Sequence, residues 1–149
     1  RAATVPFRTA LAAIFCAACG NAWSAGVSAS SLGLIPLPAK LEIRDGYWTL
    51  NPAARIVARE PAAAESAKLA DALSLPFGKR LPVVSESPRD GDIEMALTPS
   101  ATQFGAEGYR LSITPGRVVI QAANTAGLFY GGVTFRQLLP AQAFQPRRP

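Results

Sequence analysis

Apolar and polar residues alternate along three short stretches in the second half of this chain, residues 92–98, 109–114 and 118–122. A period of two is typical of half-buried β-strands, because successive side chains of a strand point to opposite faces of a sheet. Pro115–Gly116 lies between the last two stretches, and this dipeptide favours a tight turn. The pattern therefore predicts a single strand followed by a β-hairpin.

The first half of the chain contains shorter strand signals. Asp45–Gly46 separates residues 41–44 from residues 47–50, and Asp-Gly between two short runs is typical of a hairpin turn. Residues 55–58 and 81–85 are further short runs bounded by turn-forming residues. We expect a strand in each of these runs, so the predicted strands number about six or seven.

Two segments have helical spacing instead. The first opens at Pro61, where the missing N–H of proline costs nothing, and its apolar residues recur every three or four positions up to Leu73. The second follows Asn124, whose side chain is suited to capping the free N–H groups of a first helical turn. Together these elements predict an α+β fold, in which a mostly antiparallel sheet of about six to seven short strands is covered on one face by two helices.

Gly131–Gly132 lies inside the second predicted helix, where each glycine costs about 1 kcal/mol relative to alanine. Close approach of the helix to a sheet or to a neighbouring domain is the natural explanation. Leu128 and Phe135 lie on the same stripe of this helix, with Phe129 and Val133 beside it. This stripe is typical of a helix that packs in a core.

The N-terminus follows a different pattern. Arg1 and Arg8 precede an apolar run at residues 10–19, and small residues follow up to Ala25. This is the order of regions in a secretory signal peptide, and the run is too short to span a bilayer. We expect residues 1–25 to be a signal peptide and residues 26–33 a flexible lead-in. The mature protein is then expected to be periplasmic or secreted, with no transmembrane segment after cleavage.

Both cysteines, Cys16 and Cys19, lie inside the predicted signal peptide. Cleavage near Ala25 would leave a chain with neither a disulfide nor a thiolate metal site. A lipoprotein is the alternative, in which Cys19 is lipidated because residues 17–20 have small side chains in the required places. Cys16 stands where such a signal usually has leucine, which disfavours this alternative.

The charge balance predicts no nucleic-acid partner. The whole chain has 15 Lys and Arg residues against 10 Asp and Glu residues, and loss of residues 1–25 would remove only Arg1 and Arg8. The remaining basic residues are scattered, whereas nucleic-acid binding favours a concentrated stripe with interleaved aromatic residues.

The chain contains no histidine, which removes the commonest general base and metal ligand. Serine–histidine and cysteine–histidine catalysis are excluded, and so is zinc binding by His or Cys after signal cleavage. Carboxylates are the remaining acid–base groups. They are Glu42, Asp45, Glu60, Glu65, Asp71, Glu86, Asp90, Asp92, Glu94 and Glu107.

The densest acidic cluster is Asp90–Glu94, which has some likeness to part of a calcium-binding loop. It lacks the ligand spacing of an EF-hand and the later bidentate glutamate, so a solvated turn and strand face is the preferred interpretation. We therefore predict no catalytic, cofactor-binding or metal-binding residue in this chain, and no cofactor.

Residues 107–139 resemble the end of the non-catalytic N-terminal domain of family 20 glycoside hydrolases, the β-N-acetylhexosaminidases. The Pro36–Pro38 segment is similar to the opening of that domain. The resemblance implies a domain at residues 34–140, with residues 141–149 as the start of a linker to a catalytic (β/α)8 barrel, which the chain is too short to include. The matching positions are Glu107, Tyr109, Gly127, Tyr130, Gly131, Gln137 and Leu138.

For the parent enzyme, the resemblance implies retaining, substrate-assisted hydrolysis of terminal non-reducing N-acetylhexosamine residues. The acetamido oxygen of the sugar attacks the anomeric carbon, an Asp orients the acetamido group, and the adjacent Glu is the general acid/base. This chain has no Asp-Glu dipeptide, so we expect it to be inactive alone. Its implied partner is the barrel in cis, and N-acetylhexosamine glycans are the partners of the parent enzyme.

Three aromatic or amide side chains receive structural roles. Trp48 is expected to be part of a hairpin core rather than a sugar platform. Tyr130 and Gln137 are suited to hydrogen bonds with the barrel, through a phenol and an amide.

Two other interpretations stay open. The first is a stand-alone module that binds a glycan or another partner, and the second is the N-terminal domain of another glycosidase, such as a family 84 enzyme or an α-glucuronidase. An exposed apolar patch around the last helix would favour a missing barrel, because isolated domains rarely expose large patches.

Overall fold

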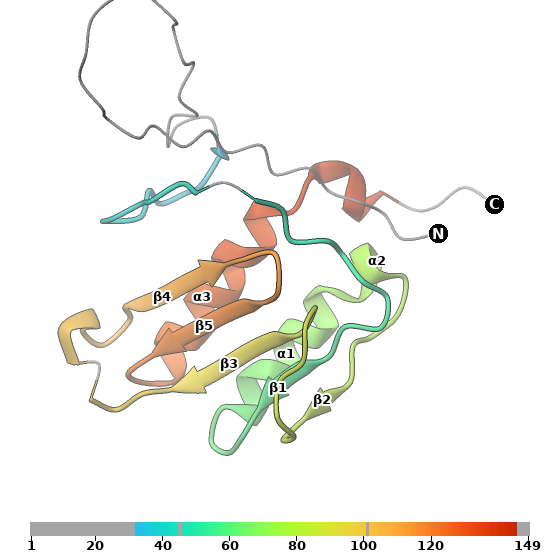
Figure 1. The fold of residues 1–149 in the computed structure, drawn as a ribbon. Helices are drawn as coiled ribbons and strands as arrows, with labels where there is room; N and C mark the ends of the chain where they lie inside the picture. Colours follow the sequence, from blue (N-terminus) through green and yellow to red (C-terminus); the bar gives the residue numbers. More distant parts are fainter. Residues whose placement is uncertain (1–31, 45, 101, 146–149) are drawn as a thin grey trace, which may run out of the picture.

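The structure, a computed structural model, describes residues 32–44, 46–100 and 102–145 (Figure 1). Within these residues five strands form one sheet in the order β2-β1-β3-β5-β4. The strands are β1 Ile56–Ala58, β2 Val83–Val84, β3 Ile93–Leu97, β4 Tyr109–Ile113 and β5 Val118–Ala122.

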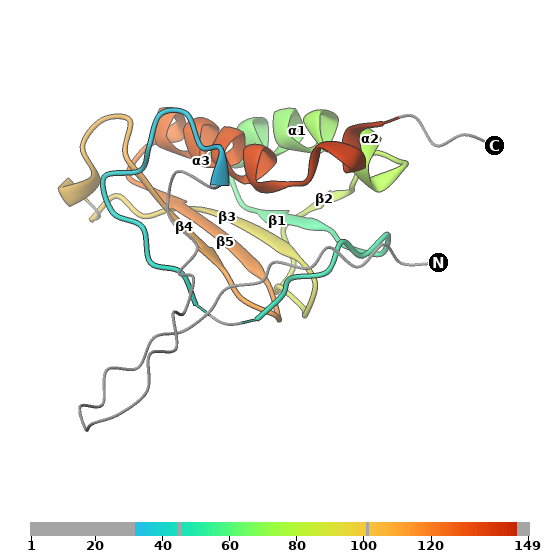
Figure 2. The same cartoon turned by 90° about the horizontal axis from the view of Figure 1, so that it is seen from above.

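Three α-helices and two short 3-10 helices accompany the sheet in the described part of the chain. Figure 2 shows that the α-helices lie together on one face of the sheet. This arrangement gives the predicted α+β class. The helices are α1 Ala63–Ala72, α2 Ser74–Phe77 and α3 Thr125–Leu138, with η2 at Thr102–Phe104 and η3 at Ala141–Phe144.

The sheet is mixed, so the prediction of a mostly antiparallel sheet of six to seven strands is wrong. β1 pairs in parallel with β2 and β3, and β3 pairs in parallel with β5. The β4–β5 hairpin is antiparallel, with Leu111 opposite Ile120. The physical reason lies in the connection after β1, because α1 and α2 return the chain to the end of the sheet at which β1 began. β2 therefore runs in the same direction as β1.

The predicted first hairpin is absent from the described residues, which omit Asp45. Residues 41–44 and 46–49 form no strand, and Leu50 makes only an isolated bridge. Burial explains the path of the segment better than strand pairing does, because Trp48 and Leu50 are both inserted into the core. Gly46 has a φ of 123°, a backbone conformation that favours glycine, but no strand pairing follows from it.

The number of helices also differs from the prediction of two. α1 and α3 occupy the predicted segments, but α2 is an additional short helix at residues where the sequence predicted only the end of α1. Gly78 ends α2 in a left-handed conformation with a φ of 72°, which glycine adopts without steric cost.

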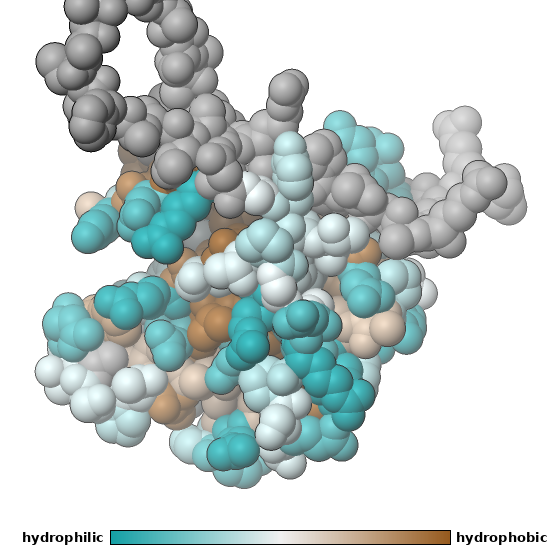
Figure 3. Space-filling view, in the orientation of Figure 1, coloured by the Kyte–Doolittle hydropathy of each residue, from teal (hydrophilic) through white to brown (hydrophobic). Residues whose placement is uncertain are grey.

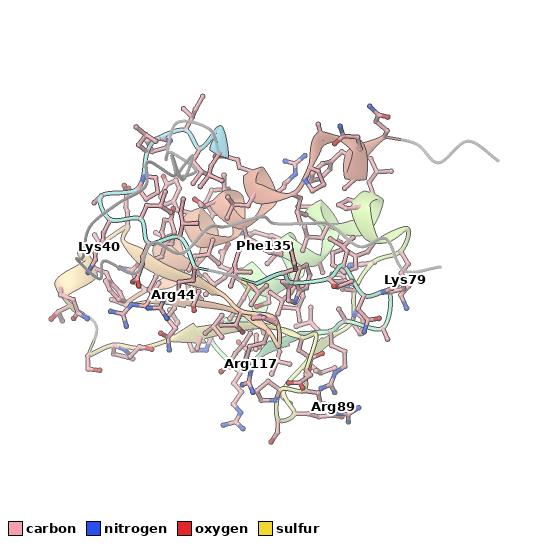
Figure 4. The ribbon with its side chains drawn as sticks, turned by 45° about the horizontal axis from the view of Figure 1, so that its top comes forward. Lys40, Arg44, Lys79, Arg89, Arg117 and Phe135 are labelled. Atoms are coloured by element: carbon pink, nitrogen blue, oxygen red, sulfur yellow. The ribbon has the colours of Figure 1, made fainter. Side chains whose placement is uncertain are left out.

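The core lies between the sheet and the helices. Phe135 of α3 is nearly fully buried, and Figure 4 shows it near the centre of the molecule. Trp48 packs edge-on against Phe135, with 5.6 Å between ring centroids, and lies 6.3 Å from the ring of Phe77. The predicted core role of Trp48 is confirmed, although it belongs to no hairpin.

The other face of the sheet is seen in Figure 3, where teal and white side chains cover most of the surface and brown side chains show between them. On β3, for example, Ile93 and Met95 are buried while Glu94 and Ala96 are only partly covered. The alternation predicted from the sequence thus places one apolar and one mixed face on the sheet.

The predicted signal peptide, with Cys16 and Cys19, lies outside the described residues, as does most of the lead-in at residues 26–33. Among the described residues, no helix combines the length and apolar composition needed to cross a membrane.

Candidate functional site

The segment at residues 107–139 folds as β4, β5 and α3, with α3 packed directly on the hairpin. Asn124 accepts a hydrogen bond from the backbone N–H of Gly127 at 3.3 Å, which confirms the predicted cap. Two glycines permit the close packing. A Cβ atom at Gly131 would overlap the side chain of Ile120, and one at Gly127 would overlap the carbonyl oxygen of Gly108.

Gly132 has a different neighbour, since a Cβ atom there would lie 3.4 Å from Leu69 of α1. The predicted close approach is therefore confirmed at Gly131, where the neighbour is the sheet. A further contact holds α3 on the hairpin, because the hydroxyl groups of Tyr109 and Thr134 are hydrogen-bonded. Tyr109, one of the positions that match the family domain, therefore helps to hold α3 on the hairpin.

The outer face of α3, by which we mean Phe129, Tyr130 and Val133, points away from the sheet. Their exposed fractions are 46%, 42% and 38%. The rings of Phe129 and Tyr130 are in contact, with centroids 5.4 Å apart and planes inclined at 70°. The last helix therefore exposes apolar side chains, and an exposed apolar patch at this place would favour a missing barrel.

The strap, by which we mean residues 32–38, is attached to the C-terminal half of α3. The side-chain amide of Gln137 accepts a hydrogen bond from the backbone N–H of Ile35 and donates one to its carbonyl oxygen, each at 3.1 Å. Gln137 is thus already paired within the domain, whereas Tyr130 is exposed. The hydrogen bonds of these two side chains with a barrel stay a prediction. No local pattern indicates the contact between Gln137 and Ile35, because the two residues are 102 positions apart.

The acidic cluster at residues 90–94 does not gather its carboxylates. Asp92 turns into the protein and meets the guanidinium of Arg55, with 2.6 Å between Nη2 and Oδ2. The two side chains are 12% and 4% exposed. Glu94 points elsewhere, with its Oε2 3.8 Å from Arg117.

Arg55 also binds Glu86 at 2.6 Å, so one guanidinium joins two carboxylates. Backbone N–H groups of Arg55 and Arg89 donate to Asp92 at 3.1 and 2.9 Å. Burial raises the pKa of Asp92, but the hydrogen bonds from Arg55 and Arg89 outweigh it and hold the pKa below its ordinary value.

A carboxylate already paired in this way is a poor cation ligand. Among the described residues there is no group of three or more His, Cys, Asp or Glu side chains placed to hold a metal ion. The geometry of Asp92 indicates a structural ion pair. The ion pair could not be predicted from local sequence, because nothing near Asp92 along the chain marks Arg55 as its partner.

Other carboxylates also have cationic partners, among them the mostly buried Glu65 and the exposed Asp71. Glu65 lies 2.8 Å from Lys68, and Asp71 lies 2.5 Å from Arg80. Figure 4 labels five basic side chains, and they come from four separate segments of the described chain. Those labelled are Lys40, Arg44, Lys79, Arg89 and Arg117.

Comparison with known proteins defines the class to which this fold belongs. Residues 31–147 match the family model described as glycosyl hydrolase family 20, domain 2. The chain therefore belongs to the family 20 glycoside hydrolases, as their domain 2, and this match spans the predicted domain at residues 34–140. No barrel is included in the 149 residues.

Two solved structures are similar to this chain. A family 20 β-N-acetylhexosaminidase of Streptomyces coelicolor A3(2) is 36% identical with a TM-score of 0.67, over 77% of this chain and 23% of its own. An N-acetyl-β-hexosaminidase of Streptomyces plicatus is 34% identical with a TM-score of 0.62, over 74% of this chain and 22% of its own.

A curated relative is a lacto-N-biosidase of Bifidobacterium bifidum, 28% identical over an alignment of 123 residues that covers 78% of this chain and 11% of that protein. The chain thus spans less than a quarter of the hexosaminidase structures and about a tenth of the lacto-N-biosidase. Domain 2 of this family normally occurs together with a catalytic domain in the same polypeptide.

Proposed function

We propose that this chain is the accessory domain of an exported β-N-acetylhexosaminidase, and that catalysis takes place in another domain of the same polypeptide. The observation that carries the proposal is the similarity to two hexosaminidase structures at 34% and 36% identity over about three quarters of the chain. The fold supports it, since the hairpin, the capped helix and its close-packed glycines all lie in the matched region.

The parent enzyme would release terminal non-reducing N-acetylhexosamine with retention of configuration. The acetamido oxygen of the substrate forms a bond to the anomeric carbon while the bond to the leaving oxygen breaks, and a glutamic acid of the catalytic domain gives its proton to that oxygen. An aspartate of the same domain orients the acetamido group. Glycosidase chemistry depends on such paired groups across the scissile bond, and we assign neither to this chain.

The carboxylates of the described residues support this assignment. Asp92, the most buried of the acidic residues, has a lowered pKa, whereas a general acid needs a raised one. Its partner Arg55 also forms an ion pair with Glu86. These groups are suited to holding the fold together, and the chain is expected to have no hydrolytic activity alone.

The test compares this chain with the polypeptide extended by its downstream coding sequence. A chromogenic N-acetyl-β-glucosaminide is the substrate, and only the extended polypeptide is expected to release the chromophore. Turnover by the purified 149-residue chain would place catalysis here and overturn the proposal. Export rests on the pattern at residues 1–25, and a mature N-terminus near Gly26 is the result expected from N-terminal sequencing.

The relative named lacto-N-biosidase motivates a second substrate for the parent enzyme. A chromogenic lacto-N-bioside, assayed beside the N-acetylglucosaminide, separates release of a disaccharide from release of a single hexosamine. We expect the monosaccharide substrate to be preferred, because both hexosaminidase structures have higher identity to this chain. Preference for the disaccharide would reverse this assignment.

A glycan-binding module is the alternative that the exposed rings of Phe129 and Tyr130 favour. Their planes are inclined at 70°, so they do not form the single flat surface on which a sugar ring stacks. Titration of the chain with chitobiose, followed by the fluorescence of its aromatic residues, is expected to show no binding. Saturable binding would favour the alternative.

A further inference from the structure

The turn that precedes β3 contains the sequence Asp90–Gly91, and both residues meet the turn of the β4–β5 hairpin. The backbone N–H of Gly91 donates a hydrogen bond to the carbonyl oxygen of Gly116 at 2.6 Å. The carboxylate of Asp90 lies over the same glycine, since a Cβ atom at Gly116 would be 3.3 Å from Oδ1 of Asp90 and 3.9 Å from its Cγ. The side-chain carboxyl group of one residue and the backbone amide of the next therefore converge on one point.

Exposure and the glycine backbone make this pair of groups suited to reaction with each other. Asp90 is exposed, and Gly91 is only partly covered. Gly91 has a φ of 91°, which glycine adopts without steric cost. Because Gly91 has no side chain, nothing on this residue obstructs the approach of its backbone nitrogen to the carboxyl carbon of Asp90.

The other Asp and Asn residues of the described chain lack this combination. Asp92 is buried in its ion pair and precedes a β-branched residue, whose side chain crowds the amide. Asp71 lies inside α1, where helical hydrogen bonds fix the backbone. Asn124 is bonded to the first turn of α3, and Asn51 precedes a proline, which has no N–H. Asp90 is thus distinguished by its place in the fold as well as by its neighbour in the sequence.

We propose that Asp90–Gly91 is a modification site, at which aspartate is converted through a cyclic imide to isoaspartate. The nitrogen of Gly91 forms a bond to Cγ of Asp90 while the bond from Cγ to the carboxyl OH breaks, and this OH leaves as water with the amide proton. A water molecule then adds to one of the two imide carbonyl carbons, the bond from that carbon to nitrogen breaks, and nitrogen regains a proton. Opening at Cγ restores aspartate, whereas opening at the main-chain carbon leaves a backbone that runs through Cγ.

The hydrogen bond between Gly91 and Gly116 controls this reaction and is also affected by it. The amide of Gly91 is free to react only when the two turns separate, so the reaction proceeds through a local opening of the fold. Isoaspartate adds one carbon atom to the main chain between the N–H of Arg89, which donates to Asp92, and the N–H of Gly91. Backbone dimensions are fixed, so the longer turn cannot keep both hydrogen bonds at their present lengths. Isomerisation is therefore expected to loosen the start of β3.

Ageing of the purified chain in mildly acidic water enriched in the heavy isotope of oxygen tests the proposal. Imide hydrolysis incorporates one heavy oxygen atom, and a protease that cleaves after glutamate releases residues 87–94 as one peptide. We expect this peptide to split into two chromatographic forms, one of which carries the heavy oxygen and an isoaspartate that fragmentation places at position 90. A synthetic peptide of residues 87–94 is aged beside the chain and is expected to react severalfold faster, because it has no contact to open. The other Asp-Gly sequence, Asp45–Gly46, falls in a different peptide.

Asp90→Ser is the matched control, since serine is suited to a turn and leaves Asp92 as the one aspartate of the peptide. We expect at least tenfold less isoaspartate in this variant, and a urea midpoint that falls on ageing only in the unchanged chain. Isoaspartate that is absent from position 90 of the chain once the synthetic peptide has reacted, or equal in the two chains, would overturn the proposal. An isomerised chain with the urea midpoint of the fresh one would overturn the loosening of β3.

Discussion

Asp92 joins three parts of the fold through one carboxylate. It accepts hydrogen bonds from the backbone and side chain of Arg55 beside β1 and from the backbone of Arg89 in the preceding turn. The acidic cluster at residues 90–94 was expected to be a solvated turn and strand face, and Asp92 departs from that expectation because it is buried. Local pattern could not predict the burial, since it depends on an arginine 37 positions away.

Replacement of Asp92 by asparagine is expected to lower the free energy of unfolding by about 1.5–3 kcal/mol, because hydrogen bonds to a charged partner are lost. Urea denaturation of the chain measures the change. Asp90→Asn is the matched control, since Asp90 is exposed, and its effect is expected to stay within about 0.5 kcal/mol. Equal effects of the two substitutions would show that the ion pair does not stabilise the fold.

The carboxylate of Asp92 is also expected to make the stability of the fold depend on pH. Its pKa is lower in the folded protein than in the unfolded chain, where it is about 3.9. Its contribution to stability is therefore complete above the unfolded value and is lost as the pH falls through the folded one. Urea denaturation at a series of acidic pH values is expected to show a smaller acid loss in Asp92→Asn than in the unchanged chain. An identical acid loss in both would contradict this role.

At the scale of elements, the agreement between sequence and structure follows the range of the interactions. The alternation of β3, β4 and β5 and the cap of α3 were predicted correctly because strand alternation, turns and caps are encoded locally. Strand direction and order were not, because they depend on where α1 and α2 return the chain. The prediction of a hairpin at Asp45–Gly46 was wrong for a related reason, since burial of Trp48 decides the path of that segment.

The two central glycines of α3 give a paired prediction. Gly131→Ala is expected to destabilise the fold by about 1–3 kcal/mol, since its Cβ atom would overlap Ile120 and force the helix off the sheet. Gly132→Ala makes only an ordinary contact with Leu69 and is expected to stabilise the helix by up to about 1 kcal/mol. Thermal unfolding of both variants measures the difference. The account of α3 packing fails if the two substitutions have the same sign.

At the scale of the whole molecule, the resemblance noted in the sequence is confirmed as membership of family 20, and the chain spans less than a quarter of the similar hexosaminidase structures. An exposed apolar surface around the last helix would favour a missing barrel, and α3 exposes Phe129, Tyr130 and Val133. The position of the strap could not be predicted from the sequence, because it joins α3 through a contact between residues near the two ends of the described chain. The domain is expected to act by supporting a catalytic partner.

Hydroxyl-radical footprinting of native aromatic side chains tests this account most directly. The oxidation rates of Phe129 and Tyr130 are compared between this chain and the polypeptide extended by its catalytic domain, with Tyr47 as an internal control because it is exposed to a similar extent, 46%. Docking on the outer face of α3 predicts that the rates at Phe129 and Tyr130 fall severalfold in the extended polypeptide while the rate at Tyr47 is unchanged. Unchanged rates at Phe129 and Tyr130 would contradict it.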